Sequence, residues 1–293
     1  MCRWLAYYGD PIPIEALVLQ RQHSLIDQSL HSRDTGADPT NGDGFGIGWY
    51  PELGGMPGMY KSIQPAWNDR NLRELAKHVS SPLFFAHIRA STGTAVQETN
   101  THPFRHGRWL FMHNGFVREF PRVRRDLLLA IDPALFPEIE GSGDSEVLFH
   151  LALTFGLEDD PLTALELMAG FVEEVGERHG VEHPLKMTVA TSDGERIIAA
   201  RYSSDGQPGS LYYSTDSRTL KEHHPDNEDL QRLSDEARAI VSEPLGELSD
   251  AWNSVPVSAI GIVKPGQDEI HQFTPRRPGD NTSPKERVSL RPS

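Results

Sequence analysis

The chain has 293 residues, of which 37% are hydrophobic, and a formal net charge of -14 at pH 7. This length is enough to bury one large core or two small ones, and we expect a single domain. The acidic balance would repel a phosphate backbone, so nucleic acid is not an expected partner. The dense basic run at 118–125, "REFPRVRR", is typical of a solvated helix face.

The amino terminus and the apolar segments indicate a cytoplasmic protein. No stretch reaches the roughly 18 consecutive apolar residues of a membrane-spanning helix. The first residues lack the basic and then apolar order of a signal peptide. The single cysteine, Cys2, can form neither an internal disulfide nor a structural zinc site made of several thiolates.

The predicted strands and helices come in groups along the chain. Short apolar or alternating runs predict strands, and longer segments with apolar residues at helical spacing predict helices. In chain order we expect strands at 3–8 and 45–50, a helix at 68–79, strands at 83–89 and 109–113, helices at 145–155 and 162–175, and strands at 187–190, 196–202 and 257–263. This grouping favours an α+β layered architecture over a parallel doubly wound sheet.

Two segments are predicted to lie outside the core. Residues 204–210, "SDGQPGS", are typical of an exposed turn between strands. Residues 274–293 are rich in proline, charge and small polar side chains, with almost nothing to bury. We therefore predict one domain at 2–273 followed by a flexible tail.

Four stretches place glycine or polar residues beside predicted strands, which makes them candidates for a functional site. They are "NGDGFGIGWY" at 41–50, "FFAHIRASTG" at 84–93, "THPFRHGRWLFMHNGF" at 101–116 and "GSGDSEV" at 141–147. The glycines at 42, 44, 46 and 48 indicate a hairpin with a bulge or a close approach of another segment. Their spacing differs from that of phosphate-binding loops.

The histidines do not indicate a metal site. Their positions in these stretches match no standard ligand spacing: His87, His102, His106 and His113. Scattered histidines near strands are more often hydrogen-bonded structural residues. We therefore predict neither a metal nor another cofactor.

Two polar positions each have a structural and a functional interpretation. Arg89 ends a predicted buried strand, and its guanidinium needs an anion, either a protein carboxylate or a substrate carboxylate. The pair Asn114-Gly115 is typical of a tight hairpin turn. Alternatively, the Asn114 amide and a glycine N–H form an oxyanion hole, which binds the negative oxygen of a reacting amide.

Cys2 also has two interpretations. A small buried residue at the start of a strand is a common structural role for cysteine. Removal of Met1 would instead place a thiol and a free α-amine on one residue. The reference pKa of an α-amine is about 8, so a neutral fraction can take the thiol proton directly or through a water. Cys2 would then carry both nucleophile and base.

Together these features resemble the class II glutamine amidotransferases, N-terminal-nucleophile hydrolases that release ammonia from glutamine. The resemblance rests on the following residues, in this order along the chain: Cys2, "HIRAST", "NTHPF", "HNG" and "GDSE". It covers roughly residues 2–265. The chain is most similar to the short stand-alone, YafJ-like type and to relatives that cleave γ-glutamyl amides in ergothioneine synthesis, because no synthase domain follows.

The resemblance implies a four-layer αββα sandwich and a glutaminase reaction through a γ-glutamyl thioester on Cys2. It implies that Asn114 and Gly115 hold the oxyanion. It also implies residues that bind or surround the substrate: Arg89 on its α-carboxylate, Asp144 on its α-ammonium, and Thr92 and His102 as pocket lining. A synthase partner subunit is a further possibility.

Two other functions stay open. In the first, the enzyme hydrolyses a larger γ-glutamyl amide, and the segment at 22–33, "QHSLIDQSLHSR", borders the leaving-group side of the pocket. The pattern of that segment favours a polar loop or an irregular helix over this role. In the second, the chain is a glutamine sensor, or an ammonia-donating subunit without turnover of its own.

Overall fold

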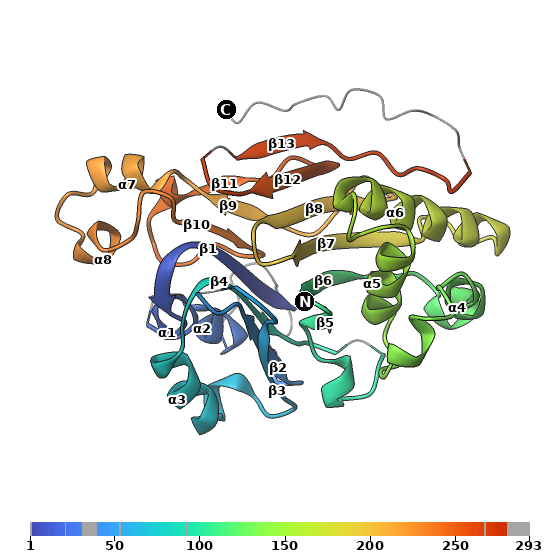
Figure 1. Cartoon of the computed structure of the whole chain (residues 1–293), viewed down its shortest axis with the longest axis horizontal. Coiled ribbons are helices and arrows are strands. Elements are labelled where there is room, and N and C mark those ends of the chain that lie inside the picture. The colour runs from blue at the N-terminus through green and yellow to red at the C-terminus, as the bar shows by residue number, and fades with distance from the viewer. Residues whose placement is uncertain are drawn as a thin grey trace.

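Two antiparallel sheets lie at the centre of the molecule, and helices cover their outer faces (Figure 1). The computed structural model describes residues 2–20, 22–30, 40–52, 54–91, 93–266 and 268–279. Within these ranges one sheet has seven strands and the other has six. The fold is therefore the α+β four-layer αββα sandwich that the sequence predicts.

The seven-stranded sheet contains the amino-terminal strand near its middle. From edge to edge its strands are β11 (Trp252–Ser254), β9 (Tyr212–Ser214), β10 (Arg238–Val241), β1 (Arg3–Pro13), β4 (Ser80–Ile88), β2 (Phe45–Trp49) and β3 (Gly58–Ser62). The helices that pack on its outer face are α1 (Glu15–Val18), α2 (Leu25–Leu30) and α3 (Arg70–His78).

The six-stranded sheet lies against the inner face of the first. Its strands are β13 (Glu269–Gln272), β12 (Ala259–Val263), β8 (Ile197–Ser203), β7 (Leu185–Ser192), β6 (Trp109–Val117) and β5 (Phe104–His106). The helices on its outer face are α4 (Phe120–Leu129), α5 (Asp144–Thr154) and α6 (Pro161–Arg178).

Three hydrophobic cores correspond to the three interfaces between these four layers. One core lies between the sheets, and one lies between each sheet and its helices. Strand β1 contributes to two of them, because successive side chains of a strand point to opposite faces. Trp4 faces the other sheet, whereas Leu5 and Tyr7 face the helices. The continuous apolar run after Cys2 therefore reflects a strand that is buried on both faces.

The predicted elements are all present, with shifted ends. The helix predicted at 68–79 begins at Arg70, because the Asp69 side chain accepts a hydrogen bond from Leu72 N at 2.8 Å and caps the helix. The hairpin-turn interpretation of Asn114-Gly115 is wrong, because both residues lie inside β6, paired with β7.

Residues 274–279 of the predicted tail lie against α6. The Arg276 N–H donates to the Glu166 carbonyl oxygen at 3.0 Å, and Arg277 forms an ion pair with Glu177. Residues 280–293 lie outside the described residues, and the domain boundary at 273 stays a prediction. None of the helices in the described ranges has the length and hydrophobicity that crossing a bilayer requires.

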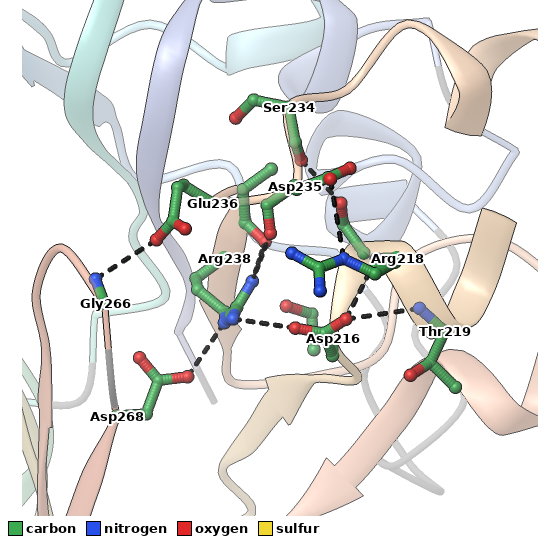
Figure 2. Close-up of polar contacts among 12 residues, drawn as sticks. Asp216, Arg218, Thr219, Ser234, Asp235, Glu236, Arg238, Gly266 and Asp268 are labelled. Carbon is green, nitrogen blue, oxygen red and sulfur yellow. Dashed lines mark hydrogen bonds and ion pairs between the residues drawn. The ribbon is translucent and has the colours of Figure 1, made fainter.

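Arg238 connects the helical segment between β9 and β10 to the six-stranded sheet. Between β9 and β10 the chain forms α7 (Ser217–His223) and α8 (Glu228–Gln231). The Arg238 guanidinium contacts Asp216, which caps α7, at 2.9 Å and Asp268, which precedes β13, at 2.8 Å (Figure 2). Burial raises the pKa of Asp268, and Arg238 opposes that shift.

Replacing Arg238 with methionine is expected to lower the free energy of unfolding at pH 7 by about 1 to 3 kcal/mol, because Asp268 keeps a partly buried charge without its cation. A carboxyl whose folded pKa is raised removes stability as pH rises through that pKa. The stability lost in Arg238→Met, measured by urea unfolding, should therefore become smaller as the pH is lowered from 7 toward about 4.5. Arg218→Met, which removes an exposed pair with Asp235, is the control and should leave the free energy of unfolding almost unchanged. Equal losses for the two variants would contradict this role of Arg238.

Candidate active site

A cavity of about 970 Å³ lies where β1 and β6 approach each other, beside the amino-terminal end of α5. Figure 1 shows the start of β1 beside β6 at the centre of the molecule. The cavity brings together six of the residues that the sequence analysis singled out: Cys2, Arg89, His102, Asn114, Gly115 and Asp144. The seventh, Thr92, lies outside the described residues.

Cys2 lies half-buried in this cavity, one residue before β1. Its sulfur accepts a hydrogen bond from Ala90 N at 3.2 Å and lies 3.4 Å from the Ala90 carbonyl oxygen. Desolvation raises the pKa of the thiol, while the Ala90 N–H and the charges of Arg89 and Arg3 act in the opposite direction. The thiol is therefore mainly protonated at rest and needs a base to become a nucleophile.

The Asn114 side chain is oriented from both ends. Its Nδ2 donates to the Cys2 carbonyl oxygen at 2.8 Å, and its Oδ1 lies 3.0 Å from Nε2 of His87. Since Oδ1 can only accept, His87 carries the proton on Nε2. Burial lowers the pKa of His87 to about 3, so this imidazole is a neutral donor at physiological pH. One N–H of the Asn114 amide is used on Cys2, and the amide has a second.

Gly115 occupies a position that other residues do not fit. Its φ of +143° lies in the region that favours glycine, and a Cβ there would lie 1.9 Å from the Lys186 carbonyl oxygen. The neighbouring strand β7 therefore approaches β6 closely beside Asn114.

Arg89 follows β4 and is 4% exposed. Its Nη2 donates to Thr94 Oγ1 at 2.6 Å and to the Ala95 carbonyl oxygen at 3.1 Å. Its buried Nη1 has no hydrogen-bond partner in the described part of the chain. Among the described residues no carboxylate forms an ion pair with Arg89, although the charge of Asp43 acts on its guanidinium.

Asp144 is the first residue of α5, and its Oδ2 accepts a hydrogen bond from Val117 N at 2.7 Å. Asn100 holds the loop before this helix: its Oδ1 accepts from Ser142 N at 2.8 Å, and its Nδ2 donates to Ala95 O at 3.0 Å. The loops that carry Arg89's partners and Asp144 are thus joined. The sequence analysis includes Asn100 in the motif "NTHPF" but does not predict that it joins these two loops.

His102 lies behind Asn114 and is buried. Its ring stacks on His87 with centroids 4.2 Å apart, and neither ring nitrogen has a hydrogen-bond partner among the described residues. Burial and the neighbouring His87 hold the pKa of His102 well below its usual range. A Cβ at Gly46 would lie 2.1 Å from the His102 carbonyl oxygen, so the glycine-rich strand permits this close approach. No three described His, Cys, Asp or Glu side chains are arranged to hold a metal.

The segment at 22–33 contributes little to this cavity in the part that the structure describes. Residues 25–30 form α2, and residues 22–30 do not line the cavity. His23 instead forms a short contact with the buried Glu243, which pairs with Arg3 at 2.7 Å. His31 and Arg33 lie outside the described residues.

The family model of the class II glutamine amidotransferases matches residues 21–278. The chain belongs to this family. A probable glutamine amidotransferase, DUG3 of Saccharomyces cerevisiae, is 34% identical to this chain over an alignment of 312 positions. The alignment covers 94% of this chain and 87% of the yeast protein. The chain described here is also 27% identical to the γ-glutamyl-hercynylcysteine sulfoxide hydrolase of Mycobacterium tuberculosis, over 69% of this chain and 77% of that protein.

A solved structure agrees with the fold. A glutamine aminotransferase class-II domain protein from Silicibacter pomeroyi superposes with a TM-score of 0.71 at 33% identity, covering 94% of this chain and all of that one. The amidotransferase described here is thus an enzyme of the amide-hydrolysing type, as the sequence predicts.

The cavity of this amidotransferase extends beyond the residues that the sequence analysis singled out as a site. Phe116 and Lys186 line it on the β6–β7 side, and Arg118 and Arg124 line it from α4 and the segment before it. The basic run at 118–125 is therefore only partly a solvated helix face. Arg125 is 84% exposed, as expected for such a face, whereas Arg124 has a buried Nε.

Proposed function

We propose that this enzyme hydrolyses glutamine or another γ-glutamyl amide through a γ-glutamyl thioester on Cys2, after removal of Met1. One observation carries the proposal: a single cavity joins the Cys2 thiol, the oriented amide of Asn114 and Nη1 of Arg89, which has no hydrogen-bond partner among the described residues. The cytoplasmic location and a synthase partner stay predictions.

The nucleophile and its base would belong to the same residue. The α-amine of mature Cys2 takes the thiol proton, and the sulfur attacks the amide carbon, whose π electrons move onto oxygen. When the C–N bond breaks, the ammonium proton passes to the leaving nitrogen, which departs as ammonia or an amine. Water then hydrolyses the thioester, which releases glutamate and restores the thiol.

The oxyanion would be bound by Asn114 and Gly115. The second N–H of the Asn114 amide is available once the first is fixed on the Cys2 carbonyl oxygen. His87 prevents the Asn114 amide from rotating its oxygen into the cavity, because that oxygen accepts a hydrogen bond from the Nε2–H of His87. Such preorganised donors stabilise the negative oxygen of the tetrahedral intermediate without reorganisation during the reaction.

The head group of the substrate would lie between Arg89 and Asp144. A carboxylate that binds the Arg89 guanidinium supplies the partner that Nη1 lacks. Asp144 keeps acceptor capacity on both oxygens beside its hydrogen bond from Val117, so it can pair with the α-ammonium. His102 would close the cavity wall behind them as a neutral ring.

A larger γ-glutamyl amide is a second candidate substrate. The mycobacterial relative is named as a γ-glutamyl-hercynylcysteine sulfoxide hydrolase. The cavity of about 970 Å³ also lies at the upper end of the roughly 300 to 1,000 Å³ typical of sites for drug-sized ligands. This volume leaves room beyond a glutamyl group.

The experiment compares glutamine with glutaric acid monoamide, which lacks the α-amino group. Wild-type enzyme should prefer glutamine in kcat/KM by roughly tenfold to hundredfold, as expected for a hydrogen bond to a charged group. Asp144→Asn should lose most of that preference. Glu119→Gln removes another carboxylate of the cavity, one already paired with Arg122, and should keep it. The same preference in wild type and Asp144→Asn would refute the role given to Asp144.

A further inference from the structure

Cys2 is held by its carbonyl oxygen from two directions. This oxygen accepts a hydrogen bond from Nδ2 of Asn114 at 2.8 Å and another from Nη1 of Arg3 at 3.2 Å. After the proposed removal of Met1, no peptide group would precede Cys2, so contacts on its carbonyl oxygen and its sulfur would orient the residue. The direction of that carbonyl therefore decides where the thiol and the α-amine lie.

The Arg3 guanidinium joins the backbone of Cys2 to a buried carboxylate. Side chains alternate along a strand, so Arg3 shares with Leu5 the face of β1 that the helices cover. Its Nε donates to Oε2 of Glu243 at 2.7 Å, while its Nη1 donates to the Cys2 carbonyl oxygen. The side chains of Arg3 and Glu243 are only 3% and 2% exposed, so water competes little for either contact.

Glu243 is in turn held by the segment at 22–30, to which the proposed function gives no role. The second carboxylate oxygen of Glu243 lies 2.5 Å from Nε2 of His23. Gln28, a fully buried residue of α2, donates from Nε2 to the carbonyl oxygens of His23 and Glu243, each at 3.2 Å. The segment is therefore connected to Cys2 through Glu243 and Arg3, although it does not line the cavity.

The stability of the fold does not by itself account for this buried ion pair. Two buried charges lose their hydration, which their attraction often fails to offset, so apolar side chains of similar volume usually stabilise a core at least as well. The pair does act on the nucleophile. The positive charge of Arg3 opposes the desolvation that raises the pKa of the Cys2 thiol. Arg3 thus supplies Cys2 with both a fixed direction and a nearby cation.

We propose that Arg3 and Glu243 are positioning residues for the nucleophile: Glu243 aims the Arg3 guanidinium, which orients Cys2 through its carbonyl oxygen and keeps a positive charge beside the thiol. This inference rests on the proposed thioester function and adds two residues that act on the reaction through Cys2. The segment at 22–30 then supports the nucleophile through Glu243, instead of bordering the leaving group.

The test compares the mature full-length enzyme with the double variant Arg3→Met/Glu243→Gln, using whichever of glutamine and γ-glutamylmethylamide the wild type hydrolyses faster. The double variant leaves neither charge of the pair without its partner and keeps an amide oxygen for His23. Its kcat should fall by about tenfold or more, as expected for the loss of a hydrogen bond from a charged donor, and its KM should change by less than about threefold. The control Arg238→Met/Asp268→Asn removes a partly buried ion pair outside the cavity and should keep the wild-type kcat.

A second measurement follows the thiol without any substrate. Cys2 is the single cysteine of the chain, so alkylation by iodoacetamide reports on it alone, and the rate rises with pH as the thiolate forms. The pH midpoint of alkylation should move upward in the double variant, because the cation that favours the thiolate is gone. Arg3→Lys should keep the wild-type midpoint and recover only part of kcat, since an ammonium keeps the charge but lacks the fork of a guanidinium.

The outcomes distinguish this inference from the proposed function. A wild-type kcat in the double variant, or a fall in kcat with an unchanged alkylation midpoint, would overturn the positioning role, the second because a merely structural defect would produce it. If the double variant does not fold, Arg3→Lys decides, and a wild-type kcat in that variant would overturn the role. A mature wild-type enzyme that hydrolyses no γ-glutamyl amide would refute the proposed function, while the midpoints would still decide whether Arg3 acts on the thiol.

Discussion

Cys2→Ala is expected to abolish amide hydrolysis, with a fall in kcat of at least about 10³-fold, because the proposed thioester forms on the sulfur that this substitution removes. The substitution removes only the sulfur, whose contacts are with Ala90, so the fold should persist. Binding should persist too. A ligand at about 100 times its Kd stabilises a protein by about 2.7 kcal/mol, which a thermal shift detects.

Two controls separate the catalytic role of Cys2 from the alternatives. Intact-mass measurement of the active wild-type protein should show that Met1 is absent, and full activity with Met1 retained would exclude the α-amine as base. A glutamine sensor would show ligand-induced stabilisation and no turnover in wild type, so Cys2→Ala would change nothing. Mass analysis after treatment with a δ-electrophilic glutamine analogue should place the adduct on Cys2.

The strands that the sequence predicts are those whose burial leaves a clear pattern. Residues 3–8 and 109–113 lie in strands that contribute to two cores, which explains their nearly continuous apolar runs. The strands that it misses are short or half-exposed. In β3 and β9 every residue is only partly buried, so neither alternation nor an apolar run distinguishes them from loops.

The candidate site was predictable where chemistry depends on residue type, and not where it depends on tertiary contacts. Cys2 and Arg89 could be singled out by residue type, because a lone thiol at the chain start and a cation at the end of a buried strand are unusual, whereas Asp144 was named only through the resemblance of "GDSE" to the family motif. The bridge made by Asn100 between two loops has no signal in sequence spacing. Sequence spacing also gives no signal that Arg124 lines the cavity. The helical pattern indicates which residues face outward, but it does not say which other segment those residues meet.

The proposed oxyanion hole gives a neutral histidine a role in catalysis without contact to the substrate. His87 is 1% exposed, and its Nε2 proton fixes which way the Asn114 amide points. With its pKa lowered to about 3, His87 stays uncharged through the range in which an α-amine and a thiol titrate. The pH dependence of kcat above about pH 4.5 should therefore contain no contribution from this ring.

Asn114→Ala is expected to lower kcat by about 10² to 10³-fold with a smaller change in KM, because the amide binds an oxygen that is negative only in the transition state. His87→Leu should lower kcat by less, about tenfold, since the amide remains but is no longer held in one orientation. His87→Gln, which keeps a donor, should recover part of that loss. If His87 is a positioning residue that acts only through Asn114, the double variant Asn114→Ala/His87→Leu should be no slower than Asn114→Ala alone. Multiplied losses in the double variant, at unchanged melting temperature, would show that His87 contributes by a separate route and that the proposed link between the two side chains is wrong.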